Sequence, residues 1–247
     1  MGSCGRMTRL VYIGNDKWHS CFDSLIEDEG LEIVHSFIPN DSFYLKNMCE
    51  QNNLNYTLTE NVNNNFEIIS TLDFDIYLVI GHPFLLDKRL LNHKQGIGFH
   101  PSLLPKRRGR APINWAIIDG LKESGVTLFY LAEGIDNGGI IFQEKFAIND
   151  QDTAAVLIRK VCAILVNNLK NILHSWPELQ VIQQDEKEAT YTIKRNPSDG
   201  EITRDMSAKD AERMVRALNG PYPSAYITMN NGERLYINEA SINEFEE

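Results

Sequence analysis

Residues 75–81 read DIYLVIG, a short apolar run of the kind that forms a strand buried on both faces of a sheet. Further runs that we interpret as strands are RLVYIG (9–14), LEIVHSFI (31–38), 56–58 and GIGFH (96–100). Amphipathic stretches typical of helices stand between these runs, at 18–27, 42–51 and 66–71. This alternation predicts an α/β fold, with a Rossmann-like parallel sheet and helices on both faces.

The second half of the chain continues this pattern and then changes it. The expected elements are a helix ending at Gly120, strands at 124–131 and 139–148, and a long helix within 152–175. From about Val181 the pattern becomes short strand-like pieces, and turn signals such as NPSDG and NNGER become frequent. The predicted division is a cloning remnant or disordered lead at 1–7, a main domain over 8–180 and a small β-rich C-terminal subdomain over 181–247.

Composition and charge restrict the class of protein. The 247 residues are 43% hydrophobic, which is enough for a substantial core. The net charge of −10 argues against a general nucleic-acid binder, which needs a basic face for phosphates. No apolar run approaches the roughly 20 residues of a membrane span, and the four cysteines form no CxxC pair. We therefore expect a cytoplasmic protein with no membrane segment, no nucleic-acid partner and no metal.

Polar residues gather at the carboxyl ends of the predicted strands. Ligands of parallel sheets bind at this edge, where IGHPF (80–84) and GFHPSLLPKRRGRAP (98–112) fall. The first strand ends in YIGNDKW and has no GxGxxG motif, so the fold alone names no dinucleotide. A lone strand-end histidine is usually structural and a basic loop is usually solvated. Here the two are adjacent, and arginine forks match phosphate oxygens, so the loop is a candidate phosphate site.

Several motifs then follow one another in a specific order. They are HPSLLP starting at His100, Arg108-Gly109, Pro112, Trp115-Ala116-Ile117, Gly125-Val126-Thr127 and Ile135-Asp136-x-Gly138-x-Ile140. In this order and spacing they resemble the transferases that use 10-formyltetrahydrofolate. Farther along, the chain resembles the segment that follows the catalytic domain in methionyl-tRNA formyltransferases and sugar N-formyltransferases, at Arg195, Asp199-Gly200, Arg216-Ala217-Leu218 and Pro221-Tyr222-Pro223.

The resemblance implies an N-formyltransferase with 10-formyltetrahydrofolate as co-substrate. His100 would donate a hydrogen bond to the developing oxyanion or handle the proton of the attacking amine, and Asp136 would fix the tautomer of His100. The implied folate-binding residues are Gly81, Phe84, Ser102, Leu103, Ala132, Gly134 and Ile135. The implied acceptor-binding residues are Lys106, Arg107, Arg108, Gly109 and Asn114.

One position departs from the family pattern. The family carries an asparagine two residues before the histidine, where its amide helps to hold the formyl oxygen, and this chain has Gly98. Strand alternation puts Gly98 and His100 on the same face, so the position is right and the amide is absent. Asn114, Lys106 or a backbone N–H could replace it, or activity could be lost.

The resemblance leaves several acceptors and roles open. Methionyl-tRNA formyltransferases carry a longer C-terminal domain and need a basic surface for tRNA, whereas this chain is acidic. We therefore expect a nucleotide-linked amino sugar as acceptor, for surface glycan biosynthesis. The alternatives are methionyl-tRNA formyltransferase, a formyl hydrolase, and a folate or nucleotide-sugar binding protein without turnover. Tyr222, Tyr226 and Tyr236 of the tail could form the surface of a homodimer.

Overall fold

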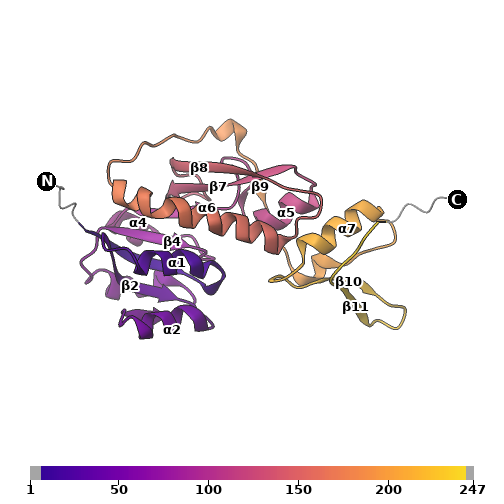
Figure 1. The fold of residues 1–247 in the computed structure, drawn as a ribbon, viewed down its shortest axis with the longest axis horizontal. Helices are drawn as coiled ribbons and strands as arrows, with labels where there is room; N and C mark the ends of the chain where they lie inside the picture. Colours follow the sequence, from indigo (N-terminus) through magenta and orange to yellow (C-terminus); the bar gives the residue numbers. More distant parts are fainter. Residues whose placement is uncertain (1–6, 243–247) are drawn as a thin grey trace.

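The computed structural model describes residues 7–242, which are built around a seven-stranded sheet (Figure 1). The strands are β1 (Thr8–Gly14), β2 (Leu31–Ile38), β3 (Tyr56–Leu58), β4 (Ile76–Ile80), β5 (Gly96–His100), β7 (Glu123–Tyr130) and β8 (Ile140–Ala147). Their order in the sheet is β3-β2-β1-β4-β5-β7-β8. The strands from β3 to β5 are all parallel, as the sequence predicts.

The last two strands run antiparallel, a direction that the sequence analysis does not assign. β7 pairs antiparallel with β5, with Thr127 opposite His100, and β8 pairs antiparallel with β7. The chain between β5 and β7, residues 101–122, stays at the carboxyl edge instead of crossing a face, so β7 starts from that edge and runs back. The sheet is therefore mixed, and the basic loop lies at the edge where the parallel strands end.

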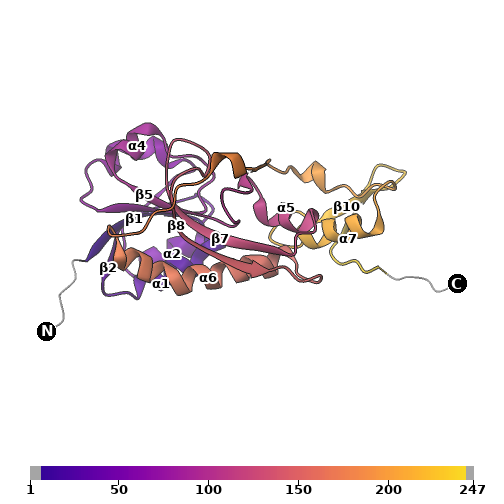
Figure 2. The same ribbon diagram turned by 90° about the horizontal axis from the view of Figure 1, so that it is seen from above.

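Helices pack on both faces of the sheet. They are α1 (His19–Ile26), α2 (Phe43–Gln51), α3 (Phe66–Ile69), α4 (Lys88–His93), α5 (Pro112–Ile118) and α6 (Ala154–Ser175). Successive residues of a strand point to opposite faces, so Leu10 and Tyr12 of β1 join one buried cluster, and Val11 and Ile13 join another. α1, α2 and α6 cover the first face, and α3 and α4 cover the second; Figure 2 shows α4 opposite α1 and α6.

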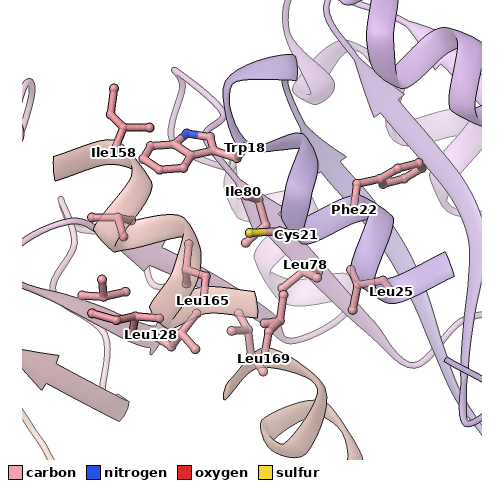
Figure 3. Close-up of a cluster of buried hydrophobic side chains, with 14 of the residues drawn as sticks. Trp18, Cys21, Phe22, Leu25, Leu78, Ile80, Leu128, Ile158, Leu165 and Leu169 are labelled. Carbon is pink, nitrogen blue, oxygen red and sulfur yellow. The ribbon is translucent and has the colours of Figure 1, made fainter. Parts of the chain in front are cut away.

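The larger cluster lies between the sheet, α1 and α6 (Figure 3). α6 begins after Thr153, whose side chain accepts a hydrogen bond from the Val156 N–H, and it turns a continuous apolar stripe to the sheet. Leu165 and Leu169 of this stripe are fully buried. Replacing either residue by alanine would cost about 2–5 kcal/mol, so this cluster fixes the position of the strand ends that carry the site.

The C-terminal part contains more helix than the sequence analysis predicts. α7 (Ala208–Ala217) packs beside the antiparallel hairpin β10 (Ala225–Thr228) and β11 (Arg234–Ile237), and the three stand at one end of the molecule in Figure 1. α7 begins after Ser207, whose hydroxyl accepts a hydrogen bond from the Asp210 N–H. The hairpin agrees with the expected β-rich subdomain, whereas α7, like α4, was not predicted.

The segment between α6 and the C-terminal elements runs back along the sheet (Figure 1, orange). Ile182 and Ile140 exchange two backbone hydrogen bonds of 2.8 Å, beside β8. Farther along, β9 (Tyr191–Thr192) pairs in parallel with β6 (Arg108–Gly109). We call residues 181–192 the strap, because they join the rim of the sheet to the basic loop.

Three further predictions concern segments and sites. Of the predicted lead at 1–7, residues 1–6 lie outside the described part of the chain and Met7 is described. Within residues 7–242, no helix combines the length and the apolar character that crossing a bilayer requires. Over the same range, no cluster of three or more His, Cys, Asp or Glu side chains is arranged to hold a metal ion.

Candidate active site

A cavity of about 980 Å³ opens at the edge where β1, β4 and β5 end. Asn15, Lys17 and Trp18 line it after β1, residues 81–86 after β4, and 98–101 around the end of β5. The loop that follows β6 and the loop between β7 and β8 add further walls. The C-terminal contribution comes from 191–197, Leu218, Tyr222 and Pro223. The cavity is therefore completed by segments far apart in the sequence.

His100 and Asp136, the predicted catalytic pair, lie together on the wall of this cavity. The His100 Nδ1 atom is 3.4 Å from Asp136 Oδ2, and the imidazole is almost fully buried. The His100 Nε2 atom lies 2.7 Å from the carbonyl oxygen of Arg107, which only accepts hydrogen bonds, so Nε2 carries a proton. Nδ1 therefore faces the carboxylate of Asp136.

The turn that carries Asp136 is held by the residues around it. Asp136 has φ +48°, in the left-handed region that residues other than glycine rarely adopt. Its Oδ2 atom accepts a hydrogen bond of 2.8 Å from the Gly109 N–H. The Gln184 side chain donates to the carbonyl oxygens of Asp136 and Gly138, over 2.8 and 2.7 Å. Side chain and backbone of Asp136 are thus both fixed by neighbours.

The predicted folate-binding residues divide into two groups. Gly81, Phe84 and Ile135 line the cavity, together with the unpredicted Val79, Leu86 and Leu131. The remaining four, Ser102, Leu103, Ala132 and Gly134, do not line it. The Ser102 hydroxyl is buried and donates to the Lys106 carbonyl over 2.7 Å, which makes it part of the turn after β5. The apolar wall is consequently formed from two loops on either side of β5.

Arg108 has a different environment from the one expected of a substrate ligand. It has no exposed surface, and its guanidinium makes five hydrogen bonds, to Gln184, Glu186 and the Tyr191 hydroxyl. An arginine side chain has five N–H donors, so none is left for a substrate phosphate. Glu186 of the strap therefore pairs with the Arg108 charge that the sequence analysis assigned to binding the acceptor.

The other members of the predicted acceptor site also separate. Lys106 and Arg107 do not line the cavity, and the Arg107 guanidinium makes a 2.7 Å ion pair with Asp119 instead. Gly109 and Asn114 do line it. The Asn114 amide nitrogen donates to the Ala217 carbonyl over 2.7 Å, so its N–H groups are partly engaged by α7.

Four basic side chains that line the cavity were not among the predicted site residues: Lys17, Arg110, Lys194 and Arg195. Asp136 is the sole acidic residue among the described residues that line it. Two of them carry a sequence signal: Arg110 belongs to the basic loop that is a candidate phosphate site, and Arg195 belongs to the C-terminal motif. Lys17 stands alone after β1, and Lys194 reaches the cavity through the path of the chain after the strap.

Lys17 is the most buried of these four cations. Its Nζ donates to the Tyr222 hydroxyl over 2.6 Å and lies 4.5 Å from the centre of the Tyr222 ring. No carboxylate pairs with it among the described residues, and burial lowers the pKa of Lys17 to about 8. Burial also raises the pKa of Tyr222 to about 12, so this partner is a neutral phenol. An anionic ligand would supply the missing counter-charge.

Gly98, the departure from the family pattern, lines the cavity with Leu131 above it. A Cβ atom added at Gly98 would lie 2.6 Å from the Leu131 Cδ2 atom and 3.7 Å from Phe129 Cζ. Leu131 therefore occupies the space that a side chain at position 98 would need. Of the two suggested replacements for the missing amide, Asn114 lines the cavity and Lys106 does not.

Comparison with known families agrees with this arrangement. The family model described as "Formyl transferase" matches residues 41–169, which is more than half of the chain. The chain belongs to the formyl transferase family. A second model, "Formyl transferase, C-terminal domain", matches residues 194–247, which include the cavity residues Lys194 and Arg195.

Individual relatives carry different names. A methionyl-tRNA formyltransferase from Ehrlichia ruminantium is 38% identical over 175 residues, covering 70% of this chain and 56% of that protein. A sugar N-formyltransferase structure from Shewanella has a TM-score of 0.75 at 19% identity, covering 97% of this chain and 100% of that one. An N-formyltransferase structure from Helicobacter canadensis, in complex with folinic acid and dTDP-3-aminofucose, has a TM-score of 0.70 at 19% identity, covering 91% and 85%.

These comparisons fix the family and the fold. At 19% identity the two structures support the fold alone. The chain spans about half the length of the curated relatives it matches. The identity of the acceptor therefore depends on the chemistry of the cavity.

Proposed function

We propose that this protein transfers a formyl group from 10-formyltetrahydrofolate to the amine of a nucleotide-linked amino sugar. The proposal rests on a His–Asp pair on the wall of a cavity whose lining contains four cationic side chains and one carboxylate. The pair supports proton handling, and the cations support an anionic acceptor.

The apolar side of the cavity fits a pterin ring. Val79, Phe84, Leu86, Leu131 and Ile135 supply apolar surface. The buried His82 Nε2 atom on the same wall has no hydrogen-bond partner among the described residues, and burial lowers the pKa of His82 to about 4, so the imidazole is neutral. A polar ring edge could satisfy this atom. Bound there, 10-formyltetrahydrofolate supplies a formyl group whose carbonyl carbon accepts the amine.

His100 and Asp136 provide the acid–base chemistry. The Nε2 atom of His100 donates to the Arg107 carbonyl and its Nδ1 atom lies 3.4 Å from the Asp136 carboxylate, so imidazole and carboxylate are held as one pair. The amine of the acceptor must lose a proton to form the amide, and this buried pair can take up that proton.

The cationic residues support an acceptor that carries phosphate. The whole chain has a net charge of −10, so four cations against one acid in a single cavity is a strong local reversal. Lys17 and Arg110 lie on the main sheet's loops, and Lys194 and Arg195 follow the strap. A diphosphate between a nucleoside and a sugar would match these donors. The dTDP-3-aminofucose bound to the Helicobacter canadensis N-formyltransferase is an acceptor of this class.

Methionyl-tRNA formyltransferase is the second candidate, because the curated relatives carry that name at up to 38% identity. A tRNA needs a broad basic surface, whereas this chain is acidic and four of its cations line a cavity. We therefore expect a small, phosphate-bearing acceptor.

The test is an assay of tetrahydrofolate release with purified protein and 10-formyltetrahydrofolate. The acceptors are UDP-, dTDP- and GDP-linked amino sugars, and initiator methionyl-tRNA. We expect turnover with at least one nucleotide-linked sugar and none with the tRNA. His100→Asn should lose the activity, whereas the matched control His174→Asn, which breaks an exposed His–Asp pair with Asp28, should retain it. Formylation of the tRNA alone would establish the second candidate instead.

A further inference from the structure

Three consecutive residues, Arg107, Arg108 and Gly109, contact both members of the catalytic pair. The carbonyl oxygen of Arg107 accepts the His100 Nε2 hydrogen bond of 2.7 Å. The N–H of Gly109 donates to Asp136 Oδ2 over 2.8 Å. A shift of this short segment would therefore change the position of His100 and of Asp136 together.

Between these two contacts, the Arg108 side chain points the other way, into the strap. The Gln184 Oε1 atom accepts from Arg108 Nε and Nη2 over 3.0 and 2.8 Å. The Glu186 carboxylate accepts from both terminal nitrogens over 2.9 and 2.7 Å, which is a bidentate pair. The Tyr191 hydroxyl takes the fifth donor over 3.1 Å. The arginine is thus saturated by one segment of the chain.

Gln184 closes the network back onto the catalytic turn. Its Oε1 atom is bound to Arg108, and its Nε2 atom donates to the carbonyl oxygens of Asp136 and Gly138. The amide cannot be flipped without losing all four bonds, because it would then present a donor to the guanidinium and an acceptor to two carbonyls. One side chain therefore joins Arg108 to the backbone of Asp136.

The backbone around this network needs external support. Asp136 at φ +48° is in a conformation that costs about 1–3 kcal/mol when a residue is not glycine. Gly109 is at φ +100°, and a Cβ there would lie 2.6 Å from the Thr192 carbonyl oxygen, so the pairing of β6 with β9 requires glycine. The strap bonds to the Asp136 carbonyl through Gln184, and its backbone carbonyls accept from the N–H groups of Arg108 and Arg110, on either side of Gly109.

We propose that Arg108 and Gln184 are positioning residues that use the strap to hold His100 and Asp136 in their reactive geometry. Neither residue lines the cavity, so they act through the 107–109 backbone and the Asp136 turn. The strap then supports the active site from behind. Gln184 lies 76 residues after Arg108 in the sequence, so the support comes from a distant part of the chain. The activity part of this inference depends on the proposed function.

Two variants and one matched control test the proposal. Gln184→Met keeps the size of the side chain and removes both halves of the bridge, and Arg108→Lys keeps the charge and loses the fork to Gln184 and Glu186. The control is Arg216→Lys, which weakens another partly buried Arg–Glu pair, with Glu212, that has no contact with the catalytic pair. Each protein is compared by thermal unfolding, steady-state kinetics, and the pH titration of the His100 ring nitrogens by nitrogen-15 NMR.

We expect kcat to fall by about 10- to 100-fold in Gln184→Met and Arg108→Lys, with the KM of each substrate within about threefold of the original. The His100 resonances of both variants should shift and titrate differently, whereas those of Arg216→Lys should match the original protein. A loss of thermal stability that Arg216→Lys shares with the two variants cannot explain why only the two variants lose kcat and shift the His100 resonances.

Two results would overturn the proposal. One is a His100 titration unchanged in both variants; the other is a kcat per folded molecule that equals that of Arg216→Lys. Either result would mean that the hydrogen bonds of Arg108 and Gln184 stabilise the fold without positioning the catalytic pair. If the unmodified protein formylates no acceptor, the proposed function fails, and the NMR comparison still decides whether the strap positions His100.

Discussion

Gly98→Asn restores the residue that the family carries two positions before the histidine, and the structure predicts that it will destabilise this chain. The new Cβ would lie 2.6 Å from Leu131 Cδ2, about 1 Å inside the normal contact distance of two carbon atoms. The amide beyond the Cβ needs further space on a wall that Leu131 already fills. Overpacking costs about 1–3 kcal/mol, and we expect the lower end here because the clashing atom is the end of a leucine side chain that borders the cavity and can turn.

A loss of this size is measurable by thermal unfolding. In a protein of this length, 1 kcal/mol corresponds to about 2–4 °C, so we expect the melting temperature to fall by roughly 2–4 °C. Combining Gly98→Asn with Leu131→Ala should recover part of the loss, because the two changes compete for one space. The double-mutant cycle should then show a coupling of about 0.5–3 kcal/mol.

The activity of Gly98→Asn should not exceed that of the unmodified protein in the amino-sugar assay. Leu131 lines the apolar wall, so displacing it also disturbs the proposed folate side. A variant that keeps the original melting temperature, shows no coupling to Leu131 and gains turnover would refute this reasoning. It would mean that position 98 is an empty place for the missing amide.

Three further predictions concern the charges of the cavity. His100→Asn and Asp136→Asn should each lower kcat by roughly 100-fold or more while folate binding, measured by fluorescence titration, survives; near-original turnover in either would exclude the pair. Lys17 is charged below its pKa of about 8 and neutral above it, so the acceptor KM should rise as the pH passes through about 8. Lys17→Arg should flatten that rise, and an unchanged profile would assign it to another group. Lys194→Ala should raise the acceptor KM by roughly tenfold and leave the folate KM unchanged, whereas an equal loss for both would place Lys194 on the folate side.

The strands of the main sheet could be predicted because their local signals agree with their burial. β2, β3 and β5 occupy the ranges expected from apolar runs, and β1 and β4 differ from them by a residue at one or both ends. The direction of β7 could not be predicted in the same way, because the length of 101–122 suits a crossover or a loop that stays at one edge. The predicted parallel sheet is confirmed for the strands from β3 to β5, and the antiparallel pairing of β7 and β8 is added by the structure.

The C-terminal part shows the limit of turn signals. The NNGER stretch does form the turn between β10 and β11, whereas NPSDG forms a 3-10 helix over Pro197–Gly200, before α7. Between them, α7 is a short helix that is stabilised by Ser207 at its start and by packing of Met214 and Val215 on the C-terminal cluster. Half of its ten residues are Ala, Met or Val and form an apolar face, so the helical pattern is present in the sequence, but the turn signals on either side point to a β-rich subdomain instead.

The basic cluster at 106–110 shows why charge along a sequence is a poor guide to charge at a site. Neighbouring side chains in an extended loop point in different directions, and here Arg107 turns to Asp119, Arg108 to the strap and Arg110 to the cavity. A fully hydrogen-bonded arginine does not serve a ligand, whereas a lysine without a carboxylate partner is available to one. The cations that meet this second condition at the cavity, Lys17 and Lys194, are separated by most of the chain. They become neighbours of one site only because the sheet edge and the segment after the strap enclose the same space.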